Sequence, residues 1–206
     1  MSIVTYNNRS IANISAIPGA AKSLTHIKTV TVSSATANVT FVDGSSDVVL
    51  DNTYPIYRFV FINCLPSSDG VKLNYNFSID TGSNYNVTKT STNFYAGHLE
   101  NDSLTGFGYD SGLAQSTNDA FGTVGAIGSA SDEGCSGEMF LFNPASTTFV
   151  KHFLGRVTIN GSNPQSQITY TGGYCDTTSA VDAVRVKFES GNIASGTIKL
   201  YGIKDS

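Results

Sequence analysis

The stretch Val181–Ile203, VDAVRVKFESGNIASGTIKLYGI, contains the clearest evidence for the fold. Val184, Val186 and Phe188 alternate with three charged residues, and this period of two places them together on one face of a strand. The glycines, asparagine and serines of ESGNIASG predict a turn, after which the alternation resumes. The stretch therefore predicts two strands of an antiparallel structure with one buried face, which need not be neighbours because the connection is too long for a two-residue hairpin.

The same alternation recurs between residues 71 and 79. It predicts that one set of side chains points into the core, namely Val71, Leu73, Tyr75, Phe77 and Ile79, and that Lys72, Asn74 and Asn76 face solvent. The following turn, Thr81–Asn84, predicts a hairpin with residues 85–90. By contrast, Tyr54–Asn63 is apolar on both faces, which predicts a central strand. Asn143–Ser146 predicts a tight turn between strands over 138–142 and 148–159.

These segments together predict about ten strands and no amphipathic helix longer than a turn or two. Their turn spacing is typical of a sandwich or barrel, and 206 residues suit one β domain. We therefore expect an all-β fold: an antiparallel β-sandwich, most simply of jelly-roll type, over residues 25–206.

Residues 1–24 have no regular period and are expected to form an extended N-terminal arm. Branched apolar residues are scattered through this segment, namely Ile3, Val4, Ile11, Ile14 and Ile17. A solvated tail is usually poorer in such residues, so they favour an arm that binds a neighbouring subunit. A disordered tail is the alternative.

Several short motifs resemble a group of virion proteins from marine and cyanobacterial bacteriophages, described as tail-fibre-like or virion structural. They are Gly191–Ile193, Gly196–Ile203, Gly82–Tyr85, Phe142–Pro144 and the run from Ile14 to Lys28. The resemblance implies an all-β module without catalytic activity, located in the virion and assembled in the host cytoplasm. Its implied partners are other virion proteins and further copies of itself.

Composition argues against several classes of function. Charged residues make up 14% of the chain and the net charge is -4, which gives no support for binding nucleic acid through its phosphates. No apolar run is long enough to span a membrane or to act as a secretory signal. Cys64, Cys135 and Cys175 are widely spaced, which favours three free thiols in a reducing cytoplasm; one disulfide plus one thiol is the alternative.

Catalytic and cofactor motifs are missing from the sequence. The three histidines are far apart, and no nucleophile elbow, zinc-protease motif, dinucleotide fingerprint or phosphate-binding loop occurs. The acidic loop Asp43–Asp47 fails the calcium-loop pattern because the twelfth position is Tyr54 rather than glutamate. We expect no enzyme, no cofactor and no metal site.

Residues 97–134 are rich in Gly, Ser, Asp and Asn, and such a long irregular excursion is usually functional or mobile. Aromatic and histidine side chains lie in or beside it, including Tyr95, His98, Phe107 and Tyr109. This mixture suits a sugar ring or a protein interface, or the aromatics fold back onto the core. The expected function is therefore a non-enzymatic virion surface subunit, decorating the capsid or forming a tail appendage. The alternatives are a host-glycan-binding adhesin and, less favoured, a glycan-degrading enzyme.

Overall fold

The computed structural model describes residues 23–103, 105–112, 116–117, 122–123 and 125–204. These residues contain no helix and form twelve strands. The strands are β1 (Leu24–Val32), β2 (Val39–Val42), β3 (Ile56–Pro66), β4 (Leu73–Ser78), β5 (Lys89–Leu99), β6 (Thr105–Tyr109), β7 (Ser116–Thr117), β8 (Gly134–Phe142), β9 (Lys151–Asn160), β10 (Gln165–Cys175), β11 (Ala183–Phe188) and β12 (Ile193–Ile203).

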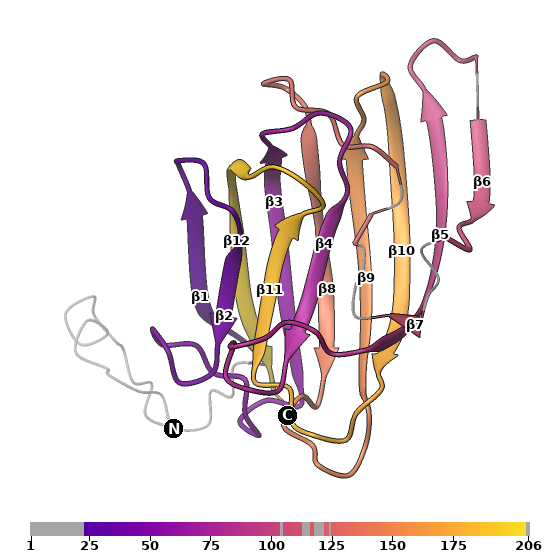
Figure 1. Ribbon diagram of the computed structural model, residues 1–206. Helices are drawn as coiled ribbons and strands as arrows, with labels where there is room; N and C mark the ends of the chain where they lie inside the picture. Colours follow the sequence, from indigo (N-terminus) through magenta and orange to yellow (C-terminus); the bar gives the residue numbers. More distant parts are fainter. Residues whose placement is uncertain (1–22, 104, 113–115, 118–121, 124, 205–206) are drawn as a thin grey trace, which may run out of the picture.

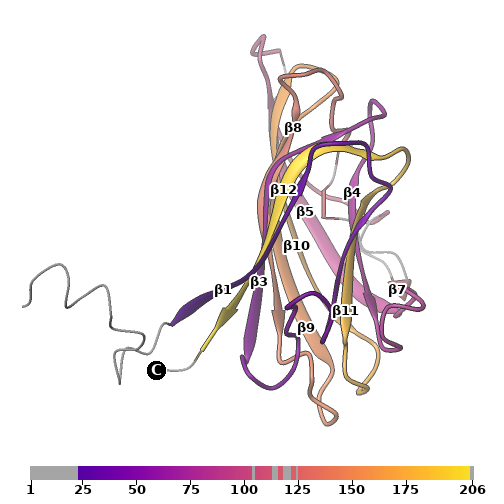
Figure 2. The same cartoon turned by 90° about the vertical axis from the view of Figure 1, so that its left-hand side faces the viewer.

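The strands form two antiparallel sheets that pack face to face (Figures 1 and 2). The large sheet has the order β1-β12-β3-β8-β9-β10-β5-β6, with β7 paired to β5, and the small sheet has the order β2-β11-β4. This arrangement confirms the predicted all-β sandwich; the jelly-roll connectivity stays a prediction. The large sheet is strongly twisted, so that β1 and the end of β12 swing away from the small sheet (Figure 2).

The core lies between the two sheets and is dominated by aromatic rings. Phe41 of β2 meets Phe59 of β3 edge-on, with ring centroids 5.4 Å apart. Phe153 of β9 contacts both Tyr75 and Phe77 of β4, at centroid distances of 5.9 and 5.4 Å. All five rings are 2% exposed or less. Such ring pairs join the layers through large buried area and favourable edge-to-face geometry.

The C-terminal stretch forms two strands as predicted, and the strands belong to different sheets. β11 is the middle strand of the small sheet, between β2 and β4. β12 pairs with β1 and β3 in the large sheet. The predicted inward positions Val184, Val186 and Phe188 are all buried, whereas Arg185 and Lys187 are only partly buried. The connection thus carries the chain from one layer to the other.

The prediction for residues 71–79 is only partly confirmed. Its first four apolar residues are buried, but Ile79 lies beyond the end of β4 and is 43% exposed. Asn74 and Asn76 do not face solvent, since each is 3% exposed. For Asn76 the reason is a cover from outside the strand that alternation cannot reveal: Asn76 Nδ2 donates to the backbone oxygen of Tyr85, and the Tyr85 ring packs 4.6 Å from the Arg185 guanidinium on the same side of the sheet.

The predicted hairpin between residues 71–79 and 85–90 is wrong. β4 pairs with β11 in the small sheet, whereas β5 pairs with β10 and β6 in the large sheet. The turn residues instead close a local loop, in which the Asp80 carboxylate accepts hydrogen bonds from the backbone and side-chain amides of Asn84.

Other predictions are confirmed: β8 and β9 are adjacent across the turn at Asn143, and β3 lies inside the large sheet.

Two glycines of the large sheet allow a matched test of strand spacing. A Cβ at Gly137 in β8 would lie 2.7 Å from Val157 Cα and still closer to the Arg156 backbone oxygen, whereas one at Gly172 would find only ordinary contacts of 3.8 Å or more. Gly137→Ala should lower the free energy of unfolding by about 3 kcal/mol because neighbouring backbone must move. Gly172→Ala should change it by less than about 1 kcal/mol. Urea melts that coincide for the two variants would contradict this account of the β8–β9 spacing.

The five apolar residues proposed for the arm, Ile3, Val4, Ile11, Ile14 and Ile17, lie outside the described residues. The description starts at residue 23, just before β1, which is the edge strand of the large sheet beside β12.

Candidate functional site

The outer face of the large sheet is the side turned away from the small sheet. Its residues are identified by strand alternation, which is strictest in β9. There, Phe153, Val157 and Ile159 are buried, while Leu154 and Arg156 between them are exposed. Cross-strand partners in the antiparallel register share a face, so the outer face can be followed from β9 to each neighbouring strand.

Four aromatic side chains gather on this face at the β10-β5-β6 end, and we call them the aromatic patch: Phe94, Phe107, Tyr109 and Tyr170. The register pairs Phe94 directly with Tyr170 on one side and with Tyr109 on the other. Phe107 is two positions along β6 from Tyr109 and therefore points to the same face. Phe107 is 78% exposed and Tyr109 61% exposed, unusually high values for large aromatic side chains.

Phe94 is the centre of the patch. Its ring stacks on Tyr170 with centroids 5.0 Å apart and planes 9° from parallel. Phe107 packs against it at 6.0 Å with a tilt of 51°. Because β5 lies between β10 and β6, Phe94 has one of these rings on each side. Phe94 is still 37% exposed, so it contributes to the exposed surface of the patch together with Phe107 and Tyr109.

A shallow depression of about 310 Å³ continues the patch towards the middle of the sheet. It is lined by Glu138, Phe140, Leu154, Gly155, Arg156 and Tyr170. Leu154 is 50% exposed and pairs in register with Phe140. Tyr170 belongs to both the patch and the depression, so the two form one continuous surface across β8, β9, β10, β5 and β6.

The charges beside the depression are arranged as one anion between two cations. Glu138 accepts hydrogen bonds from Arg58 Nε at 2.6 Å and from Arg156 Nε at 2.7 Å. Its side chain is only 8% exposed because the two arginines cover it. The Arg58 guanidinium also lies 5.8 Å from the ring centre of Phe140. The cluster leaves one net positive charge on this part of the face.

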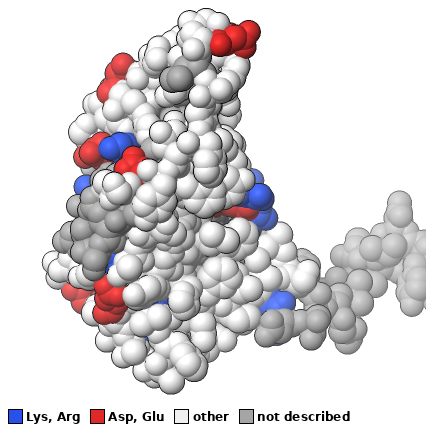
Figure 3. All heavy atoms as spheres, turned by 90° about the vertical axis from the view of Figure 1, so that its right-hand side faces the viewer, with Lys and Arg blue, Asp and Glu red and all other residues white. Residues whose placement is uncertain are grey.

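This combination of groups suits association more than chemistry. Interface centres are enriched in Tyr, Phe and Arg and depleted of Lys, Glu and Asp. Contiguous exposed apolar surface is rare in soluble monomers unless it binds something. Figure 3, which views the β5–β6 edge, shows a surface that is mostly uncharged, with the charged side chains confined to small groups.

The four ligand-binding residues predicted from sequence do not form a single group. Phe107 and Tyr109 are members of the patch. His98 lies on the same face further along β5, where it pairs with Thr105 and contacts Asp102 Oδ1 at 3.2 Å. Tyr95 is opposite Thr169, a fully buried residue of the inner face, so it points away from the other three. The four residues therefore do not lie together on one face, and their role in ligand binding stays a prediction.

Sequence reasoning missed Phe94, Tyr170 and Leu154. Phe94 shares one face of its strand with Thr92, Ala96 and His98, a period-two signal that was available between residues 92 and 98. Tyr170 and Leu154 also occupy outward positions of alternating strands. Periodicity does not show the strand order, which places β9, β10, β5 and β6 in consecutive positions of one sheet and so brings these residues onto one surface.

Within the described residues, no group of three or more His, Cys, Asp or Glu side chains is placed to hold a metal ion. The described residues also contain no helix that could cross a membrane. Comparisons with protein-family models, with curated proteins and with solved structures found no match to this chain.

Proposed function

We propose that this chain is a non-enzymatic structural subunit of a bacteriophage virion surface, held in place by protein–protein contacts through the outer face of its large sheet. The phage assignment rests on the short motifs that resemble virion proteins. The contact surface rests on the aromatic patch and the adjoining depression. Partners would be other virion proteins or further copies of this chain.

The observation that carries the proposal is the exposure of apolar rings on a regular sheet. Phe107, Tyr109 and Leu154 each leave half or more of their surface exposed, although they stand on strands and not on loop tips. Burying such side chains contributes roughly 1.5–3 kcal/mol each, so a partner that covers the patch gains substantial free energy. A face held rigid by strands also loses little conformational entropy when it binds.

The experiment compares two exposed phenylalanines. Particles would be produced from a phage genome lacking this gene and complemented with wild-type protein, Phe107→Asp or Phe149→Asp. Phe149 is 68% exposed but lies between β8 and β9, outside the patch. We expect Phe107→Asp to reduce the amount of chain per particle at least about tenfold, because a buried unpaired carboxylate opposes association. Phe149→Asp should be incorporated normally.

Two results would contradict the proposal. Absence of the wild-type chain from purified particles would contradict the virion role, and normal incorporation of Phe107→Asp would show that the patch is not part of the contact.

The second candidate function, glycan binding, is favoured by the outward rings of Phe107 and Tyr109 near the polar His98–Asp102 pair. Binding of the isolated wild-type chain to a glycan array, lost in Phe107→Ala, would support that adhesin role instead.

A further inference from the structure

Two of the three cysteines are direct neighbours on adjacent inner strands of the large sheet, near one end of both strands. Cys64 of β3 and Cys135 of β8 are opposite each other in the antiparallel register, although they are 71 positions apart in the chain. The Cys135 thiol donates to the backbone oxygen of Cys64 at a distance of 3.5 Å. Opposed residues in such a pair have Cα atoms about 4.5–5.5 Å apart, which is within the range of about 4.4–6.8 Å that a disulfide requires.

The backbone around the two thiols departs from regular strand geometry. The β3–β8 register shifts between Phe61 and Cys64, and Asn63 has a φ of 47°. This irregularity is held by Ser136, whose hydroxyl accepts a hydrogen bond from the Asn63 amide at 2.9 Å. Gly196 of β12, with a φ of +139°, leaves the Cys64 sulfur room: a Cβ there would lie 3.1 Å from that atom. The local structure therefore leaves space beside the Cys64 sulfur on the strand next to the one that carries Cys135.

Solvent reaches the neighbourhood of the pair from one side. Cys64 is 1% exposed and Cys135 is 3% exposed. However, Cys135 lines a cavity of about 290 Å³ together with polar residues that include Asn63, Glu133, Ser136 and Thr158. A small thiol or disulfide reagent entering this cavity would meet the Cys135 side of the pair first.

We propose that Cys64 and Cys135 form an intramolecular disulfide in the folded protein when it is exposed to a small-molecule disulfide such as oxidised glutathione. One protein thiolate attacks the reagent, forms a mixed disulfide and releases one glutathione thiolate. The second protein thiolate then attacks the protein sulfur of that mixed disulfide and releases the second glutathione. Two protein thiols are oxidised, one reagent disulfide is reduced, and both thiol protons pass to the released glutathione thiolates.

The environment of the pair supports unequal roles for the two thiols. A hydrogen bond between the two thiol groups lowers the pKa of Cys64, whereas the same bond, together with burial, raises the pKa of Cys135 well above its ordinary value. Cys64 is thus the thiol that ionises first. Thiol–disulfide exchange proceeds through the thiolate, so ionisation of one member of the pair prepares the reaction.

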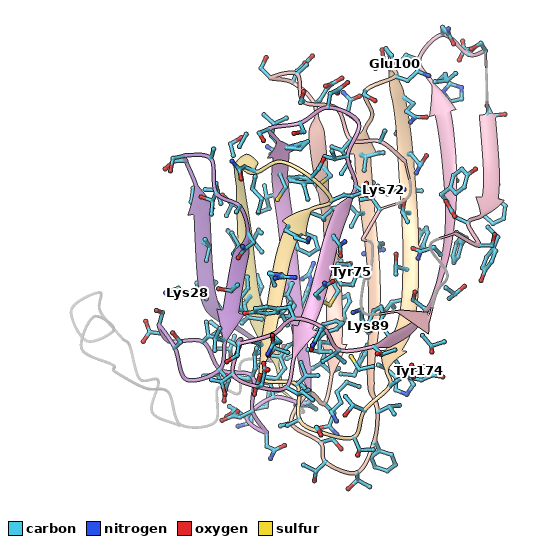
Figure 4. The ribbon with its side chains drawn as sticks, viewed as in Figure 1. Lys28, Lys72, Tyr75, Lys89, Glu100 and Tyr174 are labelled. Atoms are coloured by element: carbon cyan, nitrogen blue, oxygen red, sulfur yellow. The ribbon has the colours of Figure 1, made fainter. Side chains whose placement is uncertain are left out.

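Cys175 is excluded from this pair by its place in the sheet. It is the last residue of β10, opposite Lys89 of β5 and Lys151 of β9. Its side chain is fully buried, and burial raises its pKa to about 12. Lys89, labelled in Figure 4 at the lower end of β5, lies 5.7 Å from the Phe77 ring in the core. Cys175 should therefore remain a thiol and serves as the internal control.

The test uses the full chain, which would be incubated in glutathione buffers of increasing oxidised fraction, denatured and alkylated. We expect the oxidised protein to lose the mass of two hydrogen atoms and to retain one alkylatable thiol, Cys175. Peptide mapping should find the Cys64–Cys135 link. Because the bond closes a loop of about 70 residues, the melting temperature should rise by about 10 °C over that of the reduced protein. Cys64→Ser and Cys135→Ser should abolish the rise, and Cys175→Ser should retain it.

A second measurement separates slow access from an incompatible structure. The chain would be unfolded, refolded in the oxidising buffer and then analysed in the same way. Three alkylatable thiols after this refolding, a link that includes Cys175, or an oxidised form that melts below the reduced form would each overturn the proposal. The experiment needs no virion, so its result is independent of the proposed structural role.

Discussion

Replacing Phe188 by alanine should lower the free energy of unfolding by about 3–5 kcal/mol, the range for removing a buried aromatic ring from a core. Phe188 ends β11, the middle strand of the small sheet, and is 1% exposed. It is opposite Leu73 of β4, which is completely buried. Phe188 belongs to the buried hydrophobic core, so both lost burial and a residual cavity contribute to the loss.

Phe149→Ala is the matched control because it removes the same ring from a position that is 68% exposed. Its effect should be within about 0.5 kcal/mol, as for most surface substitutions. Urea melts of the wild type and both variants would give the two values. A loss below about 1 kcal/mol for Phe188→Ala would mean that the small sheet does not pack as described.

Local patterns in the sequence predicted the strands well because they depend on the alternation of adjacent residues. The inward positions Val186 and Phe188 are buried as the period of two requires. The same rule failed at Asn74 and Asn76, since both faces of β4 are covered and periodicity reports only which face is apolar. The residue that covers Asn76 comes from the loop after β4, and its position depends on tertiary structure.

The strand order could not be predicted, and it determines the candidate site. β5 follows β4 in sequence, yet β4 belongs to the small sheet and β5 pairs with β10 and β6 near one end of the large sheet. That placement brings Phe94 between Tyr170 and Phe107 and turns Tyr95 to the inner face. The thiol pair has the same origin, because Cys64 and Cys135 meet only through the pairing of β3 with β8.

Deleting residues 2–20 should leave the β domain folded with a nearly unchanged melting temperature and should abolish incorporation into particles. This prediction comes from the sequence: the apolar residues of the arm, such as Ile3, Ile11 and Ile17, fit neither one helix face nor one sheet face. Pro18–Gly19 also interrupts the segment. Such a segment gains little by packing on its own domain, whereas burial against a neighbour would remove its branched side chains from water.

A neighbouring subunit also offers unpaired backbone groups. In the described structure the large sheet ends in β1 and β6, and an extended arm can add hydrogen bonds along an edge strand of this kind. Thermal melts of the truncated chain and quantification of it in purified particles would check the two halves of the prediction separately. Normal incorporation would make the segment a dispensable tail. Failure to fold would place its apolar side chains in the core of their own domain, because only lost core burial would make the β-sandwich depend on residues 2–20.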